Sequence, residues 1–346
     1  MLNKLESKIF QLSNKTFYVL LVLIIVVKNG IHPIGRDWIS WVYESGQSFP
    51  APTNYLSYSF GPMFISKFLS FPSYLAWWII FGVFTLFFYV FIYFIINKYS
   101  KNNFKKYAIV FFAFTFSVSP LYYIGHYDLL TITAGILAAT TQHKYLILIA
   151  AFLAVSANPE QAIITSLCVL VFALGSKNQM DRFIAKSWIS ISVISYFSIR
   201  FFIGQGGDGS RLKIILSQLN DVSVDSIGKI NFIIFSVFGI GWVIIFIGST
   251  QIKNFVNLKL VYLGSVVMPV FFAILILDRT RVGVAVGTLP ILLLLKLYSS
   301  HLKIEDIPKR MFTYLFLAVL ITPQIFIDFD GTLRLPYAEL IKVLLV

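Results

Sequence analysis

Apolar runs recur along the whole chain and are separated by short segments that hold charges, glycine and proline. Such runs predict membrane-crossing helices, because a helix needs about 20 mostly apolar residues to cross the hydrocarbon core. We therefore expect an all-α, polytopic transmembrane bundle with about eleven spans. The expected spans cover residues 17–32, 74–97, 107–123, 129–141, 145–157, 161–175, 188–203, 230–248, 260–277, 282–297 and 311–327.

Several of these runs are short or interrupted. The four runs between residues 107 and 175 hold about 13 to 17 residues each, which is fewer than a perpendicular crossing needs. The aromatic segment 58–71, with Gly61 and Pro62, predicts a re-entrant or interfacial piece. Short helices are tolerated where their backbone lines a cavity or packs on protein. The pattern thus predicts a recessed cavity that opens outward.

Composition agrees with a single transmembrane domain over residues 1–346 and no soluble domain. Hydrophobic residues make up 58% and charged residues 12% of the sequence, and a soluble domain carries about twice that charged share. The longest polar stretches predict two outer loops, at residues 33–59 and 204–229. The single cysteine, Cys168, lies in an apolar run and predicts a small buried side chain.

The net charge is +13, and its distribution predicts an orientation rather than a nucleic-acid partner. With the N-terminus in the cytoplasm, Lys and Arg gather in the short cytoplasmic loops, as the positive-inside rule requires. Of the 15 acidic residues, only Glu6, Asp181, Glu305 and Asp306 fall on that side. We therefore expect a bacterial inner-membrane protein whose acidic outer face holds the active site.

The first outer loop holds two carboxylates seven residues apart, Asp37 and Glu44. A helix would place both on one face. Asp37 suits a general base or a ligand of a divalent cation such as Mg²⁺ or Mn²⁺, and Glu44 suits a second catalytic carboxylate. The alternative is that both are solvated loop acids and that Arg36 pairs with one of them. Trp38 in the same loop suits the headgroup level of a membrane.

A second polar group, Gly125-His126-Tyr127-Asp128, lies between two short apolar runs. A carboxylate and an imidazole at the membrane edge are unfavourable unless they are paired or functional. Asp128 is therefore a candidate catalytic residue, and His126 a group that moves a proton or binds phosphate. The alternative is that Asp128 caps the next helix, and both roles can coexist. Glu160 is a weaker substrate-binding candidate, because Pro159-Glu160 is also an ordinary helix start.

Three charged residues interrupt the apolar sequence at a later outer edge, namely Asp278, Arg279 and Arg281. Arginines on the outer side run against the positive-inside trend, and a guanidinium group binds phosphate in bidentate geometry. Arg279 and Arg281 are therefore candidate phosphate ligands, with Arg36 and Arg200 as weaker ones. The alternative is an ion pair between Asp278 and an arginine that holds two helices together.

The acidic first loop, the Gly-x-x-Asp element at residues 125–128 and the short middle helices together resemble the GT-C superfamily of membrane glycosyltransferases. The likeness covers about the first 175 residues, and beyond them it is architectural only. The resemblance implies an inverting transfer of a sugar from a polyprenyl-phosphate donor to a glycan, lipid or protein acceptor on the outer face. In that family the first-loop carboxylate acts as base or helps bind a metal, and Asp37 matches that position.

The sequence departs from the family pattern in its first loop. The pair of adjacent acids common there is replaced by Arg36-Asp37, and the next acid is Glu44. The large soluble domain of some members also has no counterpart. Metal dependence and the type of acceptor therefore stay open.

Two other classes fit parts of the pattern. The first loop also resembles that of O-antigen or exopolysaccharide polymerases, which join lipid-pyrophosphate-linked glycans and depend chiefly on arginines. A secondary transporter would suit broken helices and membrane-edge charges, but no internal repeat is evident and the charges lie away from the midplane. A glycine-rich run at residues 204–210 lacks the Lys-Ser/Thr of a P-loop, which argues against a primary pump. Lipid-linked sugars and membrane lipids are the expected partners, and nucleic acid is not.

Overall fold

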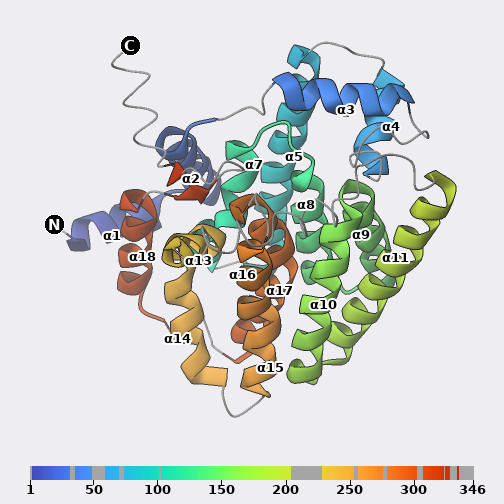
Figure 1. Ribbon diagram of the computed structural model, residues 1–346. Helices are drawn as coiled ribbons and strands as arrows, with labels where there is room; N and C mark the ends of the chain where they lie inside the picture. The colour runs from blue at the N-terminus through green and yellow to red at the C-terminus, as the bar shows by residue number, and fades with distance from the viewer. Residues whose placement is uncertain are drawn as a thin grey trace.

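The computed structural model describes residues 2–31, 36–48, 59–69, 74–100, 103–203, 228–252, 256–275, 279–301, 307–322, 324–327 and 333–334. Within these ranges the chain forms helices joined by short turns, together with the two-residue strands β1 (Phe326–Ile327) and β2 (Leu333–Arg334), which pair antiparallel. Figure 1 shows the helices gathered into one bundle, with α3 lying across the ends of other helices at the top of the view. The all-α expectation is confirmed.

The helices alternate between long and short segments along the chain. The first part forms α1 (Leu2–Gln11), α2 (Asn14–Asn29), α3 (Arg36–Ser48), α4 (Phe60–Leu69), α5 (Tyr74–Ser100), α6 (Phe104–Phe112), η3 (Thr115–Ser117), α7 (Ser119–Tyr122), α8 (Asp128–Thr140), α9 (Lys144–Ala157) and α10 (Pro159–Ser176). The rest forms α11 (Gln179–Ile203), α13 (Ile230–Phe238), η4 (Gly239–Gly241), α14 (Trp242–Ile252), α15 (Leu258–Tyr262), the π-helical η5 (Leu263–Val267), α16 (Met268–Ile274), α17 (Arg279–His301) and α18 (Lys309–Ile321).

Four helical segments of the described chain are long and apolar enough to cross a membrane: α5, α10, α17 and the combined α13–α14. The pair α1 and α2 adds a fifth if it is counted as one span, although its two parts are bent by 111°. α8, α9 and the α15–α16 segment are apolar but shorter. The chain is therefore an integral membrane protein, and the expectation of about eleven spans exceeds what helix length and composition identify.

Three expected spans are broken by local backbone chemistry. The run at 107–123 divides into α6, η3 and α7, and Pro120, which lacks an N–H donor, stands in the first turn of α7. The run at 230–248 breaks at Gly239, whose φ of +58° favours glycine. The run at 311–327 ends its helix at Ile321 and continues into β1. An apolar pattern does not reveal these breaks, because the broken segments remain apolar.

Two of the breaks satisfy each other's backbone groups inside the bundle. The Gly241 N–H donates to the Ala113 carbonyl at 2.9 Å. The Gln324 side-chain amide donates to the Thr115 hydroxyl at 2.7 Å and to the Ser236 carbonyl at 3.3 Å. Buried polar groups need such partners. The breaks are thus a built part of the core, where helices α6 and α13 change direction together.

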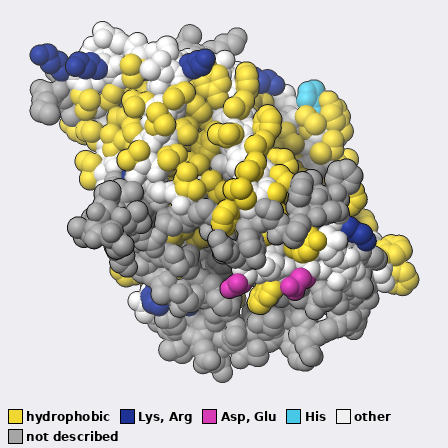
Figure 2. Space-filling view, turned by 90° about the horizontal axis from the view of Figure 1, so that it is seen from above, with side chains coloured by type: hydrophobic (Ala, Val, Ile, Leu, Met, Phe, Trp, Pro, Cys, Tyr) yellow, Lys and Arg dark blue, Asp and Glu magenta, His cyan; other side chains and the backbone are white. Residues whose placement is uncertain are grey.

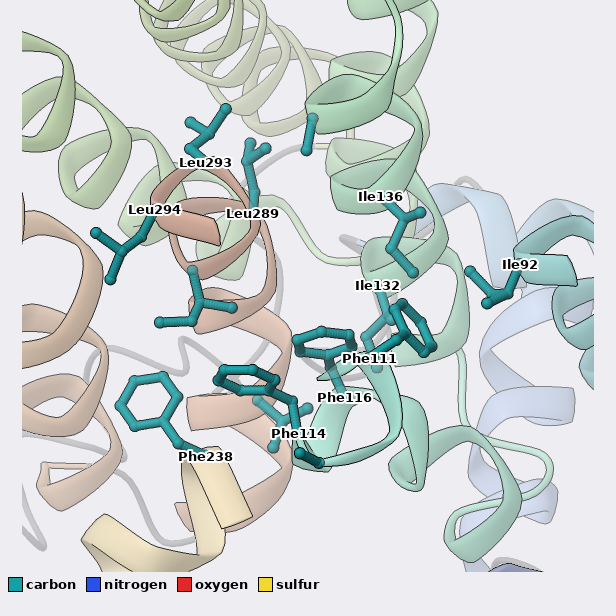
Figure 3. Packing of buried hydrophobic residues seen from close by; sticks show 14 of the residues in the cluster. Ile92, Phe111, Phe114, Phe116, Ile132, Ile136, Phe238, Leu289, Leu293 and Leu294 are labelled. Atoms are coloured by element: carbon teal, nitrogen blue, oxygen red, sulfur yellow. The ribbon is translucent and has the colours of Figure 1, made fainter. Parts of the chain in front are cut away.

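α17 is the central helix and α5 a peripheral one. In their apolar windows 78% of the residues of α17 are buried, against 33% in α5. Figure 3 shows Leu289, Leu293 and Leu294 of α17 packed in a core with side chains that include Ile132 and Ile136 of α8. Many large side chains of α5 instead face outward. Figure 2 shows a broad hydrophobic area on the described surface, and most of the Lys and Arg side chains in view lie near one edge. Such a surface suits contact with lipid chains.

The expected first outer loop and the segment after it contain helices. α3 occupies residues 36–48 of the expected outer loop. α4 holds ten residues, which is about 15 Å of helix and too short to cross a bilayer. α3 packs on α4, and α4 packs on α9. The segment expected to be re-entrant or interfacial therefore contains a short helix, α4, that packs on α3 and α9.

Candidate functional site

The Gly-x-x-Asp element forms a tight turn that sets Asp128 at the start of α8. Gly125 has a φ of +99°, a backbone conformation that favours glycine, and its carbonyl accepts a 2.8 Å hydrogen bond from the indole N–H of Trp77. The His126 N–H closes the turn on the Tyr123 carbonyl at 3.0 Å. The turn thereby brings the side chains of His126 and Asp128 together.

Asp128 lies between an imidazole and a guanidinium group that come from different parts of the chain. Its Oδ2 lies 3.3 Å from Nε of Arg281 and 3.1 Å from Nδ1 of His126. Asp128, His126 and Arg281 are only 3%, 5% and 8% exposed. Removal of charges from water is unfavourable unless they are paired. The three residues therefore form a buried charged cluster that ties the start of α8 to the start of α17.

Helix N-termini converge on this cluster. α8 begins at Asp128, α17 begins at Arg279, and the side chain of Gln161, in the first turn of α10, lies beside the Asp128 carboxylate. Each helix N-terminus carries a partial positive charge and exposed N–H donors. Together with the guanidinium groups, these N-termini make the site electropositive. Such a site favours an anion.

An aromatic ring from α3 covers the cluster. The Trp38 ring stacks on the His126 ring with centroids 5.3 Å apart, and the guanidinium carbon of Arg281 lies 5.8 Å from the Trp38 ring centroid. Stacking and cation–π contacts of this kind are favourable at these distances. α3 is thereby positioned over the N-terminal ends of α8 and α17.

Arg279 is the second arginine at the start of α17 and is only 2% exposed. The following Thr280 accepts a 2.8 Å hydrogen bond from the Ile327 N–H of β1, so the β-hairpin borders this end of α17. Within the described residues, the start of α17 holds two buried guanidinium groups, of which Arg281 contacts the Asp128 carboxylate. A full arginine charge at a helix N-terminus is unfavourable, which points to a role that requires positive charge there.

The structure places Asp37 and Glu44 on the outward face of α3. Both side chains are exposed, whereas Ile39 and Val42 of the same helix are buried. Asp37 directly precedes Trp38, so the carboxylate belongs to the helix that covers the cluster. The spacing of seven residues predicts a shared face, and the shared exposure agrees with it. Their part in chemistry stays a prediction.

Other expected residues differ in what the structure describes. Asn158 caps α10, and its Oδ1 accepts a 3.1 Å hydrogen bond from the Gln161 N–H. Glu160 is half-buried in the first turn of α10, close in sequence to the cluster. The side chains of Arg36 and Arg200, and the whole of Asp278, lie outside the described residues. An ion pair of Asp278 with an arginine therefore stays a prediction.

The sequence prediction missed the contribution of Gln161 and Trp77. Gln161 is 3% exposed and lies beside Asp128, and Trp77 holds the Gly125 carbonyl. A polar side chain inside an apolar helix was the available signal for Gln161. No pattern in the sequence could indicate which of six tryptophans supports the turn.

The expected divalent cation has no additional support from side-chain clustering. Among the described residues, no three His, Cys, Asp or Glu side chains gather as ligands for one metal ion. The Mg²⁺ or Mn²⁺ hypothesis therefore rests on Asp37 and the family resemblance. The expected outward cavity also stays a prediction, because residues 32–35, 49–58 and 276–278, which flank these elements in sequence, lie outside the described chain.

Comparison of the chain with protein-family models, with curated proteins and with solved structures finds no match. The GT-C resemblance consequently rests on the residues and motifs themselves. What the geometry adds is that Arg281, which is far away in sequence, meets His126 and Asp128 at one buried position.

Proposed function

We propose that this integral membrane protein is a glycosyltransferase that moves a sugar from a polyprenyl-phosphate-linked donor to an acceptor on the non-cytoplasmic face. The observation that carries the proposal is the buried cluster of Arg281, Asp128 and His126 at the meeting point of three helix N-termini. The cluster combines positive charge with a neighbouring helix that bears exposed carboxylates. Glycosyl transfer from a phosphate needs both kinds of group.

Positive charge would stabilise the phosphate leaving group. As the bond from the anomeric carbon to the phosphate oxygen breaks, negative charge develops on that oxygen, and preorganised donors stabilise it. Arg281 and Arg279 at the start of α17 are the donors in this proposal, since a guanidinium group fits a phosphate in bidentate geometry. The N-termini of α8 and α10 add to the same field.

The two kinds of carboxylate take different roles. The Asp128 carboxylate is paired with Arg281 and lies beside His126, so it acts as a positioning residue that holds both side chains in place. Asp37 is exposed on α3 and is the candidate base that removes the proton of the acceptor hydroxyl group. Glu44, on the same face, is the second carboxylate. Trp38 links the two parts, because it follows Asp37 directly in the chain and its ring stacks on the His126 ring of the cluster.

The direct test is an activity assay in nanodiscs with a panel of radiolabelled short-chain polyprenyl-phosphate sugars and lipid or glycan acceptors. Wild-type protein is expected to yield labelled acceptor, and Asp37→Ala to lose at least about 100-fold in rate, the lower range of general base catalysis. Glu6→Ala, which removes a carboxylate of α1, is the matched control and keeps wild-type activity. Unchanged transfer by folded Asp37→Ala protein would remove the assigned base.

A polymerase of lipid-pyrophosphate-linked glycans is the second candidate. It is favoured because Arg279 and Arg281 are buried, whereas Asp37 is exposed. In that case Arg279→Ala and Arg281→Ala abolish chain growth and Asp37→Ala does not. A transporter is supported only by broken helices, and it would give substrate flux into sealed vesicles without covalent transfer.

A further inference from the structure

A second feature lies at the opposite end of α8 and α17. The two helices run parallel: Asp128 meets Arg281 at their first turns, a Cβ on Gly135 would lie 3.3 Å from the Leu289 nitrogen, and Lys296 donates to the Ala139 carbonyl at 3.3 Å. From Arg281 to Lys296 the helix rises about 22 Å. The features at the two ends are therefore separate sites.

At this far end the described residues line a cavity of about 630 Å³. The walls come from α5, α6, α8, α14, α17 and α18, and they are almost entirely aliphatic or aromatic. The volume is that of a typical small-molecule site. Ordered water molecules are not favoured in such a cavity, because each needs two to four polar partners.

The opening of the cavity is bordered by apolar side chains that face outward. Val243 and Ile247 of α14 line the cavity and are 46% and 41% exposed, and Met311 and Tyr314 of α18 line it and are 45% and 50% exposed. In a membrane protein, exposed apolar side chains on both borders face lipid chains. The cavity therefore opens sideways, and hydrocarbon is the solvent that meets its mouth.

Cationic groups lie at the same end. Arg310 is exposed, its Nε donates to the Tyr314 hydroxyl at 3.2 Å, and Tyr314 lines the cavity. Lys309 is its exposed neighbour in the first turn of α18. Among the described lining residues Lys296 is charged and none is acidic. Lys296 also interacts with Asp181, whose carboxyl pKa is raised mainly by burial. Arg310 and Lys309 are exposed cations on α18, and Lys98 of α5 is a further exposed cation whose Nζ lies 5.4 Å from the ring centroid of the lining Tyr99.

We propose that this cavity binds an anionic phospholipid, with one acyl chain between α14 and α18 and the headgroup phosphate at Arg310 and Lys309. The apolar walls select a hydrocarbon chain, and the cations select an anionic over a zwitterionic headgroup, since a basic residue near a membrane surface attracts anionic lipid. This lipid site is independent of the proposed glycosyl transfer and lies at the other end of the bundle.

The test uses delipidated full-length protein and two lipids with identical acyl chains, phosphatidylglycerol and phosphatidylcholine. Binding is followed by native mass spectrometry at increasing lipid concentration. Wild-type protein is expected to bind phosphatidylglycerol about tenfold more tightly than phosphatidylcholine. Arg310→Gln should weaken phosphatidylglycerol alone by about fivefold, the share of one basic side chain. Lys259→Gln, which removes an exposed lysine of α15, a helix that contributes no lining residue, should change neither.

A bulk substitution tests the acyl-chain pocket separately from the headgroup site. Ala318 lines the cavity, whereas Ile321, three residues further along α18, is 72% exposed. Ala318→Phe should weaken the binding of both lipids about tenfold, because its side chain takes up space in the cavity. Ile321→Phe should weaken the binding of neither.

Equal effects of Ala318→Phe and Ile321→Phe, or of Arg310→Gln and Lys259→Gln, would contradict the proposal. A wild-type dimer that Ala318→Phe dissociates without any change in lipid binding would instead show an interface between two copies. If Ala318→Phe fails to fold, the Arg310→Gln and Lys259→Gln pair still decides.

Discussion

The two ends of α8 and α17 bury opposite kinds of surface. At their N-terminal end, Asp128 and Arg281 are buried as a charged pair, and the His126 imidazole lies beside the same carboxylate. At their C-terminal end, apolar side chains surround open volume. The same two helices thus carry a polar site and an apolar site about 20 Å apart. Burial alone therefore does not identify a binding site, whereas the chemistry of the buried groups indicates which ligand each site accepts.

The charged end should be the more sensitive of the two to a single substitution. Arg281→Gln removes one partner of the buried Asp128 carboxylate, and we expect a loss of about 3–5 kcal/mol in the free energy of unfolding. Denaturant titration in mixed micelles measures the loss. The exposed Arg310→Gln serves as control and should stay within about 0.5 kcal/mol of wild type.

The double variant Asp128→Asn/Arg281→Gln sharpens that result. Because it removes both charges, it should be more stable than the sum of the single variants predicts. Strict additivity would mean that the pair does not interact in the folded protein.

Between the two ends, truncation should depend on how completely the side chain is packed. Leu289 is 1% exposed in the core of α17, whereas Leu292 lines the cavity. Leu289→Ala should lower the free energy of unfolding by about 2–5 kcal/mol, because it leaves a void. Leu292→Ala enlarges a space that already exists and should lower it by less. Equal losses would indicate that the cavity is filled by packed side chains when the protein is in a membrane.

The junction between α13 and α14 should show a smaller effect. A Cβ at Gly241 would lie 2.4 Å from ring carbons of Phe114, whereas a Cβ at Gly82 would meet nothing within 4 Å. Gly241→Ala should therefore destabilise the protein by about 1–3 kcal/mol through overpacking. Gly82→Ala, on lipid-facing α5, is the matched control and should be neutral or slightly stabilising in the same titration. A neutral Gly241→Ala would show that the two broken helices can move apart without loss.

Hydrophobic pattern was enough to predict the all-α membrane class and the approximate positions of most helices. α8, α9 and α10 each lie within two residues of the expected runs. The number of full spans was too high in part because the break before Pro120 depends on backbone geometry that leaves the apolar pattern intact. The α13–α14 segment stays long enough to cross despite its break at Gly239. The helix α3 was expected only conditionally, since its sequence mixes charges and aromatic residues.

The candidate site was predictable in part. Membrane-edge charges pointed to His126, Asp128, Arg279 and Arg281, and the structure brings Asp128 together with His126 and Arg281. Their meeting depends on the parallel packing of α8 and α17, which no local pattern records. The apolar cavity was not predictable, because most of the residues that line it also suit a packed core.

The claim that the charged end accepts a phosphate on a polyprenyl chain is tested most directly by binding of a short-chain polyprenyl monophosphate to purified protein in nanodiscs. The account predicts that wild-type protein binds it more tightly than the matching uncharged polyprenol, and that Arg281→Gln loses at least about tenfold in affinity, as expected for loss of a charge-assisted bidentate contact. Ala318→Phe, at the other end of the bundle, should leave this affinity unchanged. Equal binding of polyprenol and polyprenyl phosphate, or an unaltered affinity in folded Arg281→Gln protein, would contradict it.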